Sequence, residues 1–261
     1  MTAEAPVTTA PGRDVTGSLE RYRGRMDLVI TPVFFLLLAF SVAVVWIYVD
    51  FDLQTTSILR PAKLLRETGQ HLAMTFWSTL AVIVIAIPLG ILLTRPRFRG
   101  LTGPVLGVAN AGQAIPAYGL LILFLAWIGP GLQTAVYALI VYAILPILRN
   151  TMVGLDQVDK SVIEAGRGMG LSKWQALRRI ELPLAVPVIL AGVRTALVIN
   201  VGTAALGFLI GAGGLGVSIG AGLQLQRDTA TFVAGALVAM LALMVDFTAA
   251  SIERWLRPKG L

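Results

Sequence analysis

The chain has 261 residues, of which 56% are hydrophobic and only 13% are charged. A soluble domain is typically about 45–50% apolar and about 25% charged, and the mean hydropathy of +0.81 departs in the same direction, so the composition excludes an ordinary soluble enzyme. The net charge of +7 comes from residues spread between apolar runs, which argues against a nucleic-acid partner. With no cysteine and one histidine, the chain offers neither a thiolate metal site nor a disulfide, and we expect no metal.

Five long uncharged runs determine the predicted fold class. They cover 28–49, 72–94, 100–148, 195–226 and 229–245. About 20 apolar residues cross a bilayer as one helix, so the third run must fold back on itself, and Gly129-Pro130-Gly131 is the expected turn. The sequence predicts an all-α polytopic membrane protein with about six transmembrane helices, at about 28–49, 72–94, 104–128, 132–149, 184–206 and 229–252.

The basic residues favour one orientation in the membrane. Sixteen of the 21 Lys and Arg residues fall on one side of the predicted spans, if Arg149 is counted with the connection after the fourth span. The other side receives Arg60, Lys63, Arg66 and Arg227. Because positive residues accumulate in cytoplasmic loops, we expect both termini in the cytoplasm of a multi-pass plasma (inner) membrane protein surrounded by lipid. Residues 1–27 are predicted to be a disordered cytoplasmic tail, and 28–255 the transmembrane domain.

The connection between the fourth and fifth spans, Asn150 to Pro183, has a helical pattern of its own. Apolar residues at helical spacing predict a helix that ends in a run of glycines. Ser172 and Gln175 match a capping box that would start a second helix, and Pro183 opens the next span. Such a helical hairpin lies against lipid headgroups or docks a soluble partner, and its amphipathicity alone leaves both alternatives open.

A spaced motif in this connection indicates a family. Glu164-Ala-Gly-x-x-x-Gly170, followed by Ile180-x-Leu182-Pro183, resembles the Glu-Ala-Ala-x-x-x-Gly…Ile-x-Leu-Pro loop in the permease subunits of binding-protein-dependent ABC importers. The resemblance implies a MetI-like permease domain in which 157–182 is the coupling loop, seated in a groove of an ATPase subunit. The coupling residues that it implies are Glu164, Ala165, Gly166, Gly170, Leu171, Ile180, Leu182 and Pro183. Gly166 stands where the family has a second alanine, and we expect it to weaken the helix turn slightly.

Further segments narrow the resemblance. Gln113 to Pro116, Leu145 to Thr151, Val193 to Ala196 and Ile210 to Gly216 look like the osmoprotectant importers of glycine betaine, carnitine or choline, over about 70–255. This implies two ATPase subunits that carry ATP and Mg, a second permease subunit, identical or homologous, and an extracytoplasmic solute-binding protein. The chain itself has no G-x-x-x-x-G-K-[ST] loop, so we expect no cofactor and no catalytic residue in it.

The segment 202–222 contains eight glycines. Gly211-x-Gly213-x-x-Gly216 matches the dinucleotide-binding string, but no βαβ pattern surrounds it. Irregular backbone at membrane depth is tolerated where protein or a water-filled path surrounds it, so the glycines either line the pathway or its gate, or serve helix packing. The candidate pathway or gate residues are Gln113, Tyr118, Asn200, Gly211, Gly213, Gly214 and Gly216.

Arg194 and Asp246 are the only charged residues well within the predicted spans. Isolated charge is costly there, so we expect the two to form a structural pair, with a proton relay as the alternative. Four aromatic residues are able to attract a quaternary ammonium ion or to anchor a span at the membrane interface: Tyr118, Trp127, Tyr137 and Tyr142. His71, at the end of its span, is expected to be an interfacial residue.

These observations predict a non-catalytic permease subunit of an ATP-driven importer for a small compatible solute, a quaternary amine. The alternative in the same class is an ABC permease for another small solute such as an amino acid. An ion-coupled secondary carrier would need intramembrane acids or repeated halves, and a membrane-embedded enzyme would need convergent titratable groups.

Overall fold

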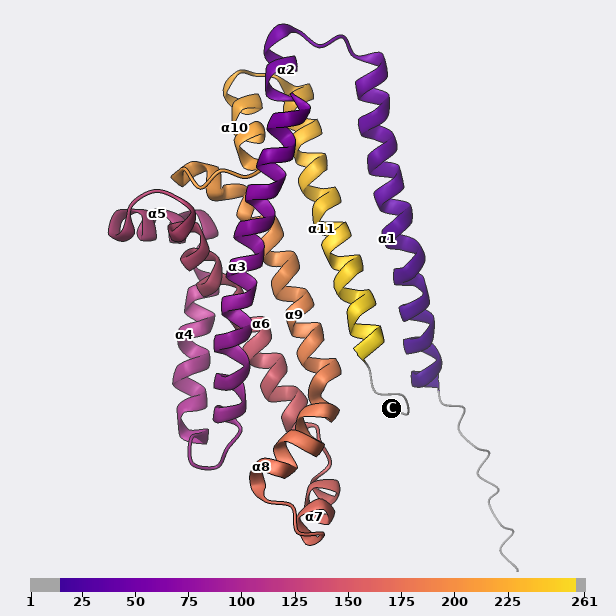
Figure 1. Cartoon of the computed structure of the whole chain (residues 1–261), viewed down its shortest axis with the longest axis vertical. Coiled ribbons are helices and arrows are strands. Elements are labelled where there is room, and N and C mark those ends of the chain that lie inside the picture. The colour runs from indigo at the N-terminus through magenta and orange to yellow at the C-terminus, as the bar shows by residue number, and fades with distance from the viewer. Residues whose placement is uncertain (1–14, 257–261) are drawn as a thin grey trace, which may run out of the picture.

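The computed structural model describes the backbone of residues 15–256 and the side chains of residues 30–255 (Figure 1). Residues 1–14, which belong to the predicted tail, and residues 257–261 lie outside the described residues. The first helix begins at Val15, so the part of the predicted tail from residue 15 onward is helical. The described part of the chain contains helices and no strand, in the order α1 (Val15–Tyr48), α2 (Leu53–Ile58), α3 (Pro61–Leu93), η1 (Arg99–Leu101), α4 (Thr102–Ala114), α5 (Ala117–Ile128), α6 (Leu132–Asp156), α7 (Lys160–Gly168), α8 (Lys173–Ala176), η2 (Leu177–Glu181), α9 (Leu182–Ala204), η3 (Ala205–Ile210), α10 (Gly216–Gln224) and α11 (Asp228–Leu256).

Among the described residues, five helical segments are long and apolar enough to cross a membrane. They are Ile30–Tyr48, Pro61–Leu93, Leu132–Asp156, Lys173–Ile210 and Asp228–Trp255. A sixth span is completed if α4 and α5 are counted as one bent pair. The fold class is therefore the predicted one, an all-α polytopic membrane protein.

The expectation of one continuous helix over 104–128 is wrong. Ile115 and Pro116 have extended backbone angles, and the axes of α4 and α5 differ by 99°. The ring of a proline disfavours helical angles at the residue before it, and no helical neighbour restores the turn here. In Figure 1, α5 runs sideways from the end of α4. The Gly129-Pro130-Gly131 turn lies where it is predicted, and both glycines have positive φ, +95° and +122°.

Small residues hold the central helices α3, α6 and α9 close together. A Cβ on Gly90 would lie 2.8 Å from the Cβ of Thr151, and one on Gly192 would lie 2.7 Å from the Cβ of Asn150. A Cβ on Gly154 would lie 3.1 Å from the carbonyl oxygen of Ala185. Lipid tails are as apolar as the helices, so the hydrophobic effect does not drive helices together in a membrane. Close packing of their backbones through small residues stabilises the association instead.

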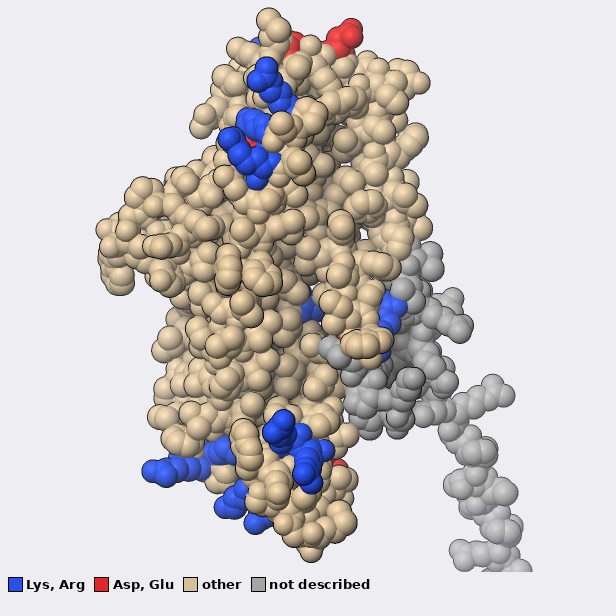
Figure 2. All heavy atoms as spheres, viewed as in Figure 1, with Lys and Arg blue, Asp and Glu red and all other residues tan. Residues whose placement is uncertain are grey.

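The α7 and α8 hairpin forms one end of the molecule, which we call the hairpin end, and α2 and α10 lie at the opposite end (Figure 1). On the face shown in Figure 2, Lys and Arg gather at both ends, and a mostly uncharged band lies between them. Helix α1 lies beside α11 and exposes large apolar side chains, including Leu36, Leu37 and Phe40, to its surroundings. This distribution is typical of a bundle whose middle lies in lipid.

Candidate functional site

The hairpin that contains the family motif is built from local capping interactions. Asp159 caps α7 by accepting a hydrogen bond from the backbone N–H of Ser161 at 2.8 Å, and this bond lowers the pKa of the Asp159 carboxyl. Ser172 and Gln175 form the predicted capping box, in which the Ser172 Oγ accepts from the Gln175 N–H and the Gln175 Oε1 accepts from the Ser172 N–H. Gly170 joins the two helices with a φ of +93°, a conformation that glycine adopts without steric cost.

Gly166 has a packing role that the sequence analysis does not predict. A Cβ at this position would overlap the Cδ1 of Ile180 and would lie 3.3 Å from the Cδ1 of Leu171. The expected effect was a slightly weaker helix turn. The structure adds a packing role: because Gly166 has no side chain, α7 lies directly on Ile180, and Gly166, Leu171 and Ile180 form one contact.

Several side chains of the hairpin are exposed. Glu164 and Ala165 are exposed, and Glu164 has no side-chain hydrogen bond or ion pair among the described residues. Met169 and Trp174 are 81% and 67% exposed. The hairpin therefore offers exposed apolar area together with a free carboxylate.

An ion pair that the sequence analysis missed links the hairpin to α3. The Arg95 Nη2 lies 2.6 Å from the Glu181 Oε2, and the Arg95 Nη1 lies 3.3 Å from the Glu181 Oε1. Glu181 is buried, whereas the Arg95 side chain is one third exposed. The sequence analysis uses Arg95 only as one of the sixteen basic residues that indicate the orientation. The acidic residue directly between Ile180 and Leu182 is the signal from which a buried ion pair could have been predicted.

The hairpin continues into α9 without a break. Residues Leu177–Glu181 form a π-helical turn, and Leu182 follows it directly as the first residue of α9, with Pro183 in the first turn. An apolar hollow of about 840 Å³ lies between this turn and the end of α3, with Ile91, Trp174 and Leu177 in its lining. The Arg95–Glu181 pair is therefore a polar link beside a loosely filled region.

At the opposite end, α3 holds the glycine-rich segment through polar contacts made by the exposed Gln70 and the buried Glu67 and His71. The Gln70 Oε1 accepts from the Gly214 N–H at 3.1 Å, and the Ser218 Oγ donates to the Glu67 Oε2 at 2.6 Å. The His71 Nε2 lies 2.8 Å from the Val201 carbonyl. His71 is fully buried, so the expectation of an interfacial residue is wrong. His71 is buried because α3 begins at residue 61, earlier than the uncharged run suggests, and the same early start buries Glu67, on which the sequence analysis makes no prediction.

Steric constraints explain why the predicted gate segment is rich in glycine. Gly211, Gly213 and Gly214 have φ values of +72°, +83° and +85°. A Cβ on Gly213 would overlap Gln70, and one on Gly216 would overlap the carbonyl of Ala205. These contacts are what the packing alternative requires of the segment.

The other pathway candidates do not converge within this single chain. Asn200 is buried and donates from its Nδ2 to the Ser78 Oγ and the Thr79 Oγ1, both at 3.0 Å, so it joins α9 to α3. Gln113 is half-buried and donates to the Tyr142 carbonyl at 3.3 Å.

The aromatic candidates also stay apart from one another. Tyr118 is 54% exposed, Trp127 86% and Tyr137 49%. Ring pairs in the described residues join Trp46 to Phe51 and Phe76 to Trp77, and involve none of the four candidates.

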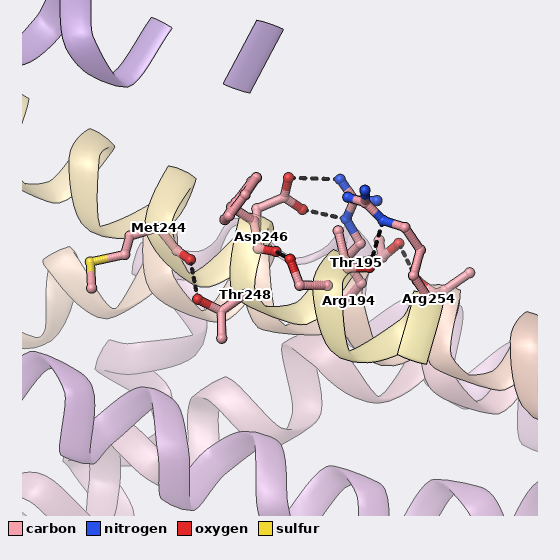
Figure 3. A network of polar contacts seen from close by, with 10 residues as sticks. Arg194, Thr195, Met244, Asp246, Thr248 and Arg254 are labelled. Atoms are coloured by element: carbon pink, nitrogen blue, oxygen red, sulfur yellow. Dashed lines mark hydrogen bonds and ion pairs between the residues drawn. The ribbon is translucent and has the colours of Figure 1, made fainter. Parts of the chain in front are cut away.

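Arg194 and Asp246 are in direct contact across α9 and α11 (Figure 3). The Arg194 Nε lies 2.5 Å from the Asp246 Oδ1, and the Nη2 lies 2.7 Å from the Oδ2. The two side chains are 28% and 21% exposed, so the pair lies near the surface of this chain rather than in its core. Two parallel N–H···O bonds are the strongest geometry for such a pair.

A further arginine lies inside a span. Arg149, which we counted with the connection after the fourth span, is in α6, seven residues before its end. Its Nη2 donates to the Asn110 Oδ1 of α4 at 2.9 Å.

Comparison with known proteins identifies the family. Residues 86–258 match the family described as "Binding-protein-dependent transport system inner membrane component". The chain is 40% identical to the glycine betaine/carnitine/choline transport system permease protein OpuCB of Bacillus subtilis over 199 residues, which cover 76% of this chain and 91% of the relative. It is 42% identical to the osmoprotectant import permease protein OsmY of Salmonella typhimurium over 200 residues, which cover 76% and 84%.

Among solved structures, the inward-facing methionine ABC transporter MetNI is similar to this chain, with a TM-score of 0.67 and 30% identity over 76% of this chain and 97% of that one. The ATPase of such importers is a separate subunit, in agreement with the absence of a phosphate-binding loop in this sequence. The match over more than half of its residues shows that the chain belongs to the family of binding-protein-dependent transport system inner membrane components, as the permease of an ABC importer.

Proposed function

We propose that this permease moves a small compatible solute, a quaternary amine of the glycine betaine, carnitine and choline class, into the cell. The relatives that support the proposal are named for these solutes and are about 40% identical over about three quarters of the chain. The alternative is another small solute such as an amino acid, for which the similarity to a methionine transporter at 30% identity is the supporting observation.

The proposed assembly has two copies of a separate ATPase, which bind ATP and Mg, and a second permease subunit, identical or homologous. A solute-binding protein would deliver the solute on the extracytoplasmic side. The hairpin end would face the cytoplasm, with both termini on that side, since most basic residues fall there. Lipid would surround the remaining faces of the 28–255 permease domain.

In this assembly the 157–182 loop would transmit the ATPase motion. The exposed Glu164 and its neighbours would seat in the ATPase, because a free carboxylate beside exposed apolar area suits a docking surface. Gly166 and Ile180 would pass the force across the hairpin, and Leu182 and Pro183 would pass it to α9. The observation that carries this proposal is the unbroken helical path from residue 173 into α9, joined to α3 by the Arg95–Glu181 pair.

The pathway candidates Gln113, Tyr118, Asn200, Gly211, Gly213, Gly214 and Gly216 remain a proposal of the same kind. The glycine-rich segment lies at the end of α3 opposite to the hairpin, which is where an outer gate would be needed. Its hydrogen bonds to Gln70 and Glu67 would hold such a gate closed.

The test is solute uptake into proteoliposomes that contain the permease, its ATPase and its binding protein. We expect ATP-dependent uptake of glycine betaine, carnitine or choline, and none of methionine. We expect Glu164→Ala to reduce ATPase co-purification and uptake together. Normal uptake and ATPase binding in that variant would return the hairpin to the interfacial alternative, and uptake of methionine alone would contradict the solute class.

A further inference from the structure

Arg149 lies at the depth of the intramembrane ion pair rather than at the membrane surface. Its neighbour Asn150 packs against Gly192, which is ten residues into α9 and only two residues before Arg194. At a rise of about 1.5 Å per residue, ten residues correspond to about 15 Å from the start of that helix. Asn110, the partner of Arg149, is likewise eight residues into α4.

The counter-charge that such an arginine needs does not come from the described part of this chain. Asn110 is a neutral partner and occupies one of the five N–H donors of the guanidinium. No carboxylate of residues 30–255 lies within ion-pair distance of Arg149, whereas Arg194 has Asp246. A charged side chain within a span faces a bundle interior or a water-filled cavity and marks a path for ions or substrate.

The surface around Asn110 differs from the surface that α1 offers. Most exposed residues of α4 are small or polar, including Gly103, Gly107, Asn110 and Ala111. Val108, at 76% exposed, is the one large apolar side chain among them. On α1 the exposed residues are large and apolar. A face of small and polar residues at membrane depth suits a second subunit or a water-filled path better than lipid.

We propose that Arg149, oriented by Asn110, binds the carboxylate of the transported solute inside the membrane. The inference rests on the proposed function and adds a selectivity to it. A guanidinium pairs with a carboxylate through two parallel N–H···O bonds, which an alcohol cannot form. Glycine betaine and carnitine carry a carboxylate, whereas choline carries a hydroxyl in its place. Arg149 therefore favours zwitterionic quaternary amines over cationic ones during translocation.

The experiment compares the uptake of glycine betaine, carnitine and choline by the complete reconstituted transporter, each with saturating solute-loaded binding protein. We expect Arg149→Gln to lower the uptake of the two carboxylate-bearing solutes by about tenfold or more, because the variant loses two charge-assisted hydrogen bonds. Choline uptake should change by less than about twofold. Arg149→Lys keeps the charge and should retain part of the activity, and Asn110→Ala should show the same selectivity loss in weaker form. The matched control is Arg99→Gln, which removes an arginine that is 67% exposed at the hairpin end.

Four outcomes would overturn the assignment of Arg149. An equal loss for all three solutes would give the residue a structural role, and unchanged uptake would remove it from the path. An equal loss that appears in vesicles containing anionic phosphatidylglycerol and vanishes in pure phosphatidylcholine would assign the arginine to a lipid phosphate. A wild-type transporter that imports choline but no carboxylate-bearing solute would also overturn it while leaving the proposed function in place. A wild type that imports none of the three would contradict the solute class itself.

Discussion

Arg95, just beyond the end of α3, donates hydrogen bonds from both of its Nη atoms to the carboxylate of Glu181 in the π-helical turn. Glu181 precedes the first residue of α9, so this single pair joins the hairpin to two of the central helices at once. A movement of the hairpin would therefore pull on α3 as well as on α9. The link is buried on the carboxylate side and partly open to solvent on the arginine side.

Breaking this pair should destabilise the protein. Loss of one partner of a buried pair typically costs about 3–5 kcal/mol, and the exposure of Arg95 reduces the expected cost of Arg95→Ala or Glu181→Ala to about 1–3 kcal/mol. The double variant should cost less than the sum of the two. Thermal unfolding in detergent of the three variants and the wild type measures this, and strict additivity would mean that the contact contributes nothing.

The Arg194–Asp246 pair should behave in the same way between α9 and α11. We expect Arg194→Ala and Asp246→Ala to lower the free energy of unfolding by about 1–3 kcal/mol each, because the pair is about one quarter exposed and an uncompensated charge remains after either change. The double variant should recover part of that loss. Reversal of the two residues, Arg194→Asp with Asp246→Arg, provides the control, since it restores opposite charges. A reversed pair as unstable as the single variants would show that the orientation rather than the charge matters.

Two glycines of the hairpin offer a matched comparison of backbone requirements. Gly170 has a φ of +93°, whereas a Cβ on Gly168 would meet nothing within 4 Å and its backbone is not in the left-handed region. We expect Gly170→Val to abolish uptake and to weaken ATPase co-purification while the protein still inserts into the membrane, and Gly168→Val to retain both. Similar activities of the two variants would mean that the turn geometry is not needed for coupling.

The glycine-rich segment allows a second matched pair. A Cβ on Gly216 would overlap the backbone carbonyl of Ala205, but one on Gly202 would meet nothing within 4 Å. Overpacking typically costs about 1–3 kcal/mol, so Gly216→Ala should lower the midpoint of thermal unfolding clearly. Gly202→Ala, inside α9, should leave it unchanged or raise it, by up to about 1 kcal/mol of helix propensity. Equal midpoints would show that the segment relaxes easily around a methyl group.

The orientation can be tested with single cysteines, because the chain contains none of its own. Cysteines at Thr56 and Gln226 should react with a membrane-impermeant maleimide added to intact cells. Cysteines at Arg97 and Glu164 should react only after the membrane is opened. Labelling of position 164 from outside would reverse the topology and with it the proposed ATPase contact.

Hydropathy and local capping patterns predicted much of this architecture. The apolar runs located the long helices, and the Ser172–Gln175 box began α8 because a capping box depends only on residues close in sequence. The helical spacing and the glycines that follow it predicted the hairpin for the same reason, whereas its coupling role came from the resemblance to a family. These features arise from local chemistry, which a single sequence contains in full.

Features that depend on tertiary neighbours were missed. The bend at Pro116 was missed because a proline within a span is often tolerated, since neighbouring helices re-satisfy the freed backbone groups, and 104–128 was therefore expected to be one helix. The burial of Glu67 was not predicted and His71 was expected at the interface, because the uncharged run begins only at residue 72, although Pro61 is a typical first residue of a helix. Their burial becomes visible only once Val201 and Ser218 are seen beside them.

The π-helical turn at Leu177–Glu181 has a geometric consequence for the direction in which the hairpin faces. A π turn contains one residue more than the α turn that it replaces, and each residue of a helix advances the side-chain direction by about 100°. Removing one residue from this turn would leave the composition of the hairpin almost unchanged, yet it would swing α7 and α8 by about that angle around the axis of α9. The number of residues in the turn thus determines the angle at which the hairpin projects from the membrane bundle. A partner that is complementary to the hairpin at one angle would not be complementary to it at the other.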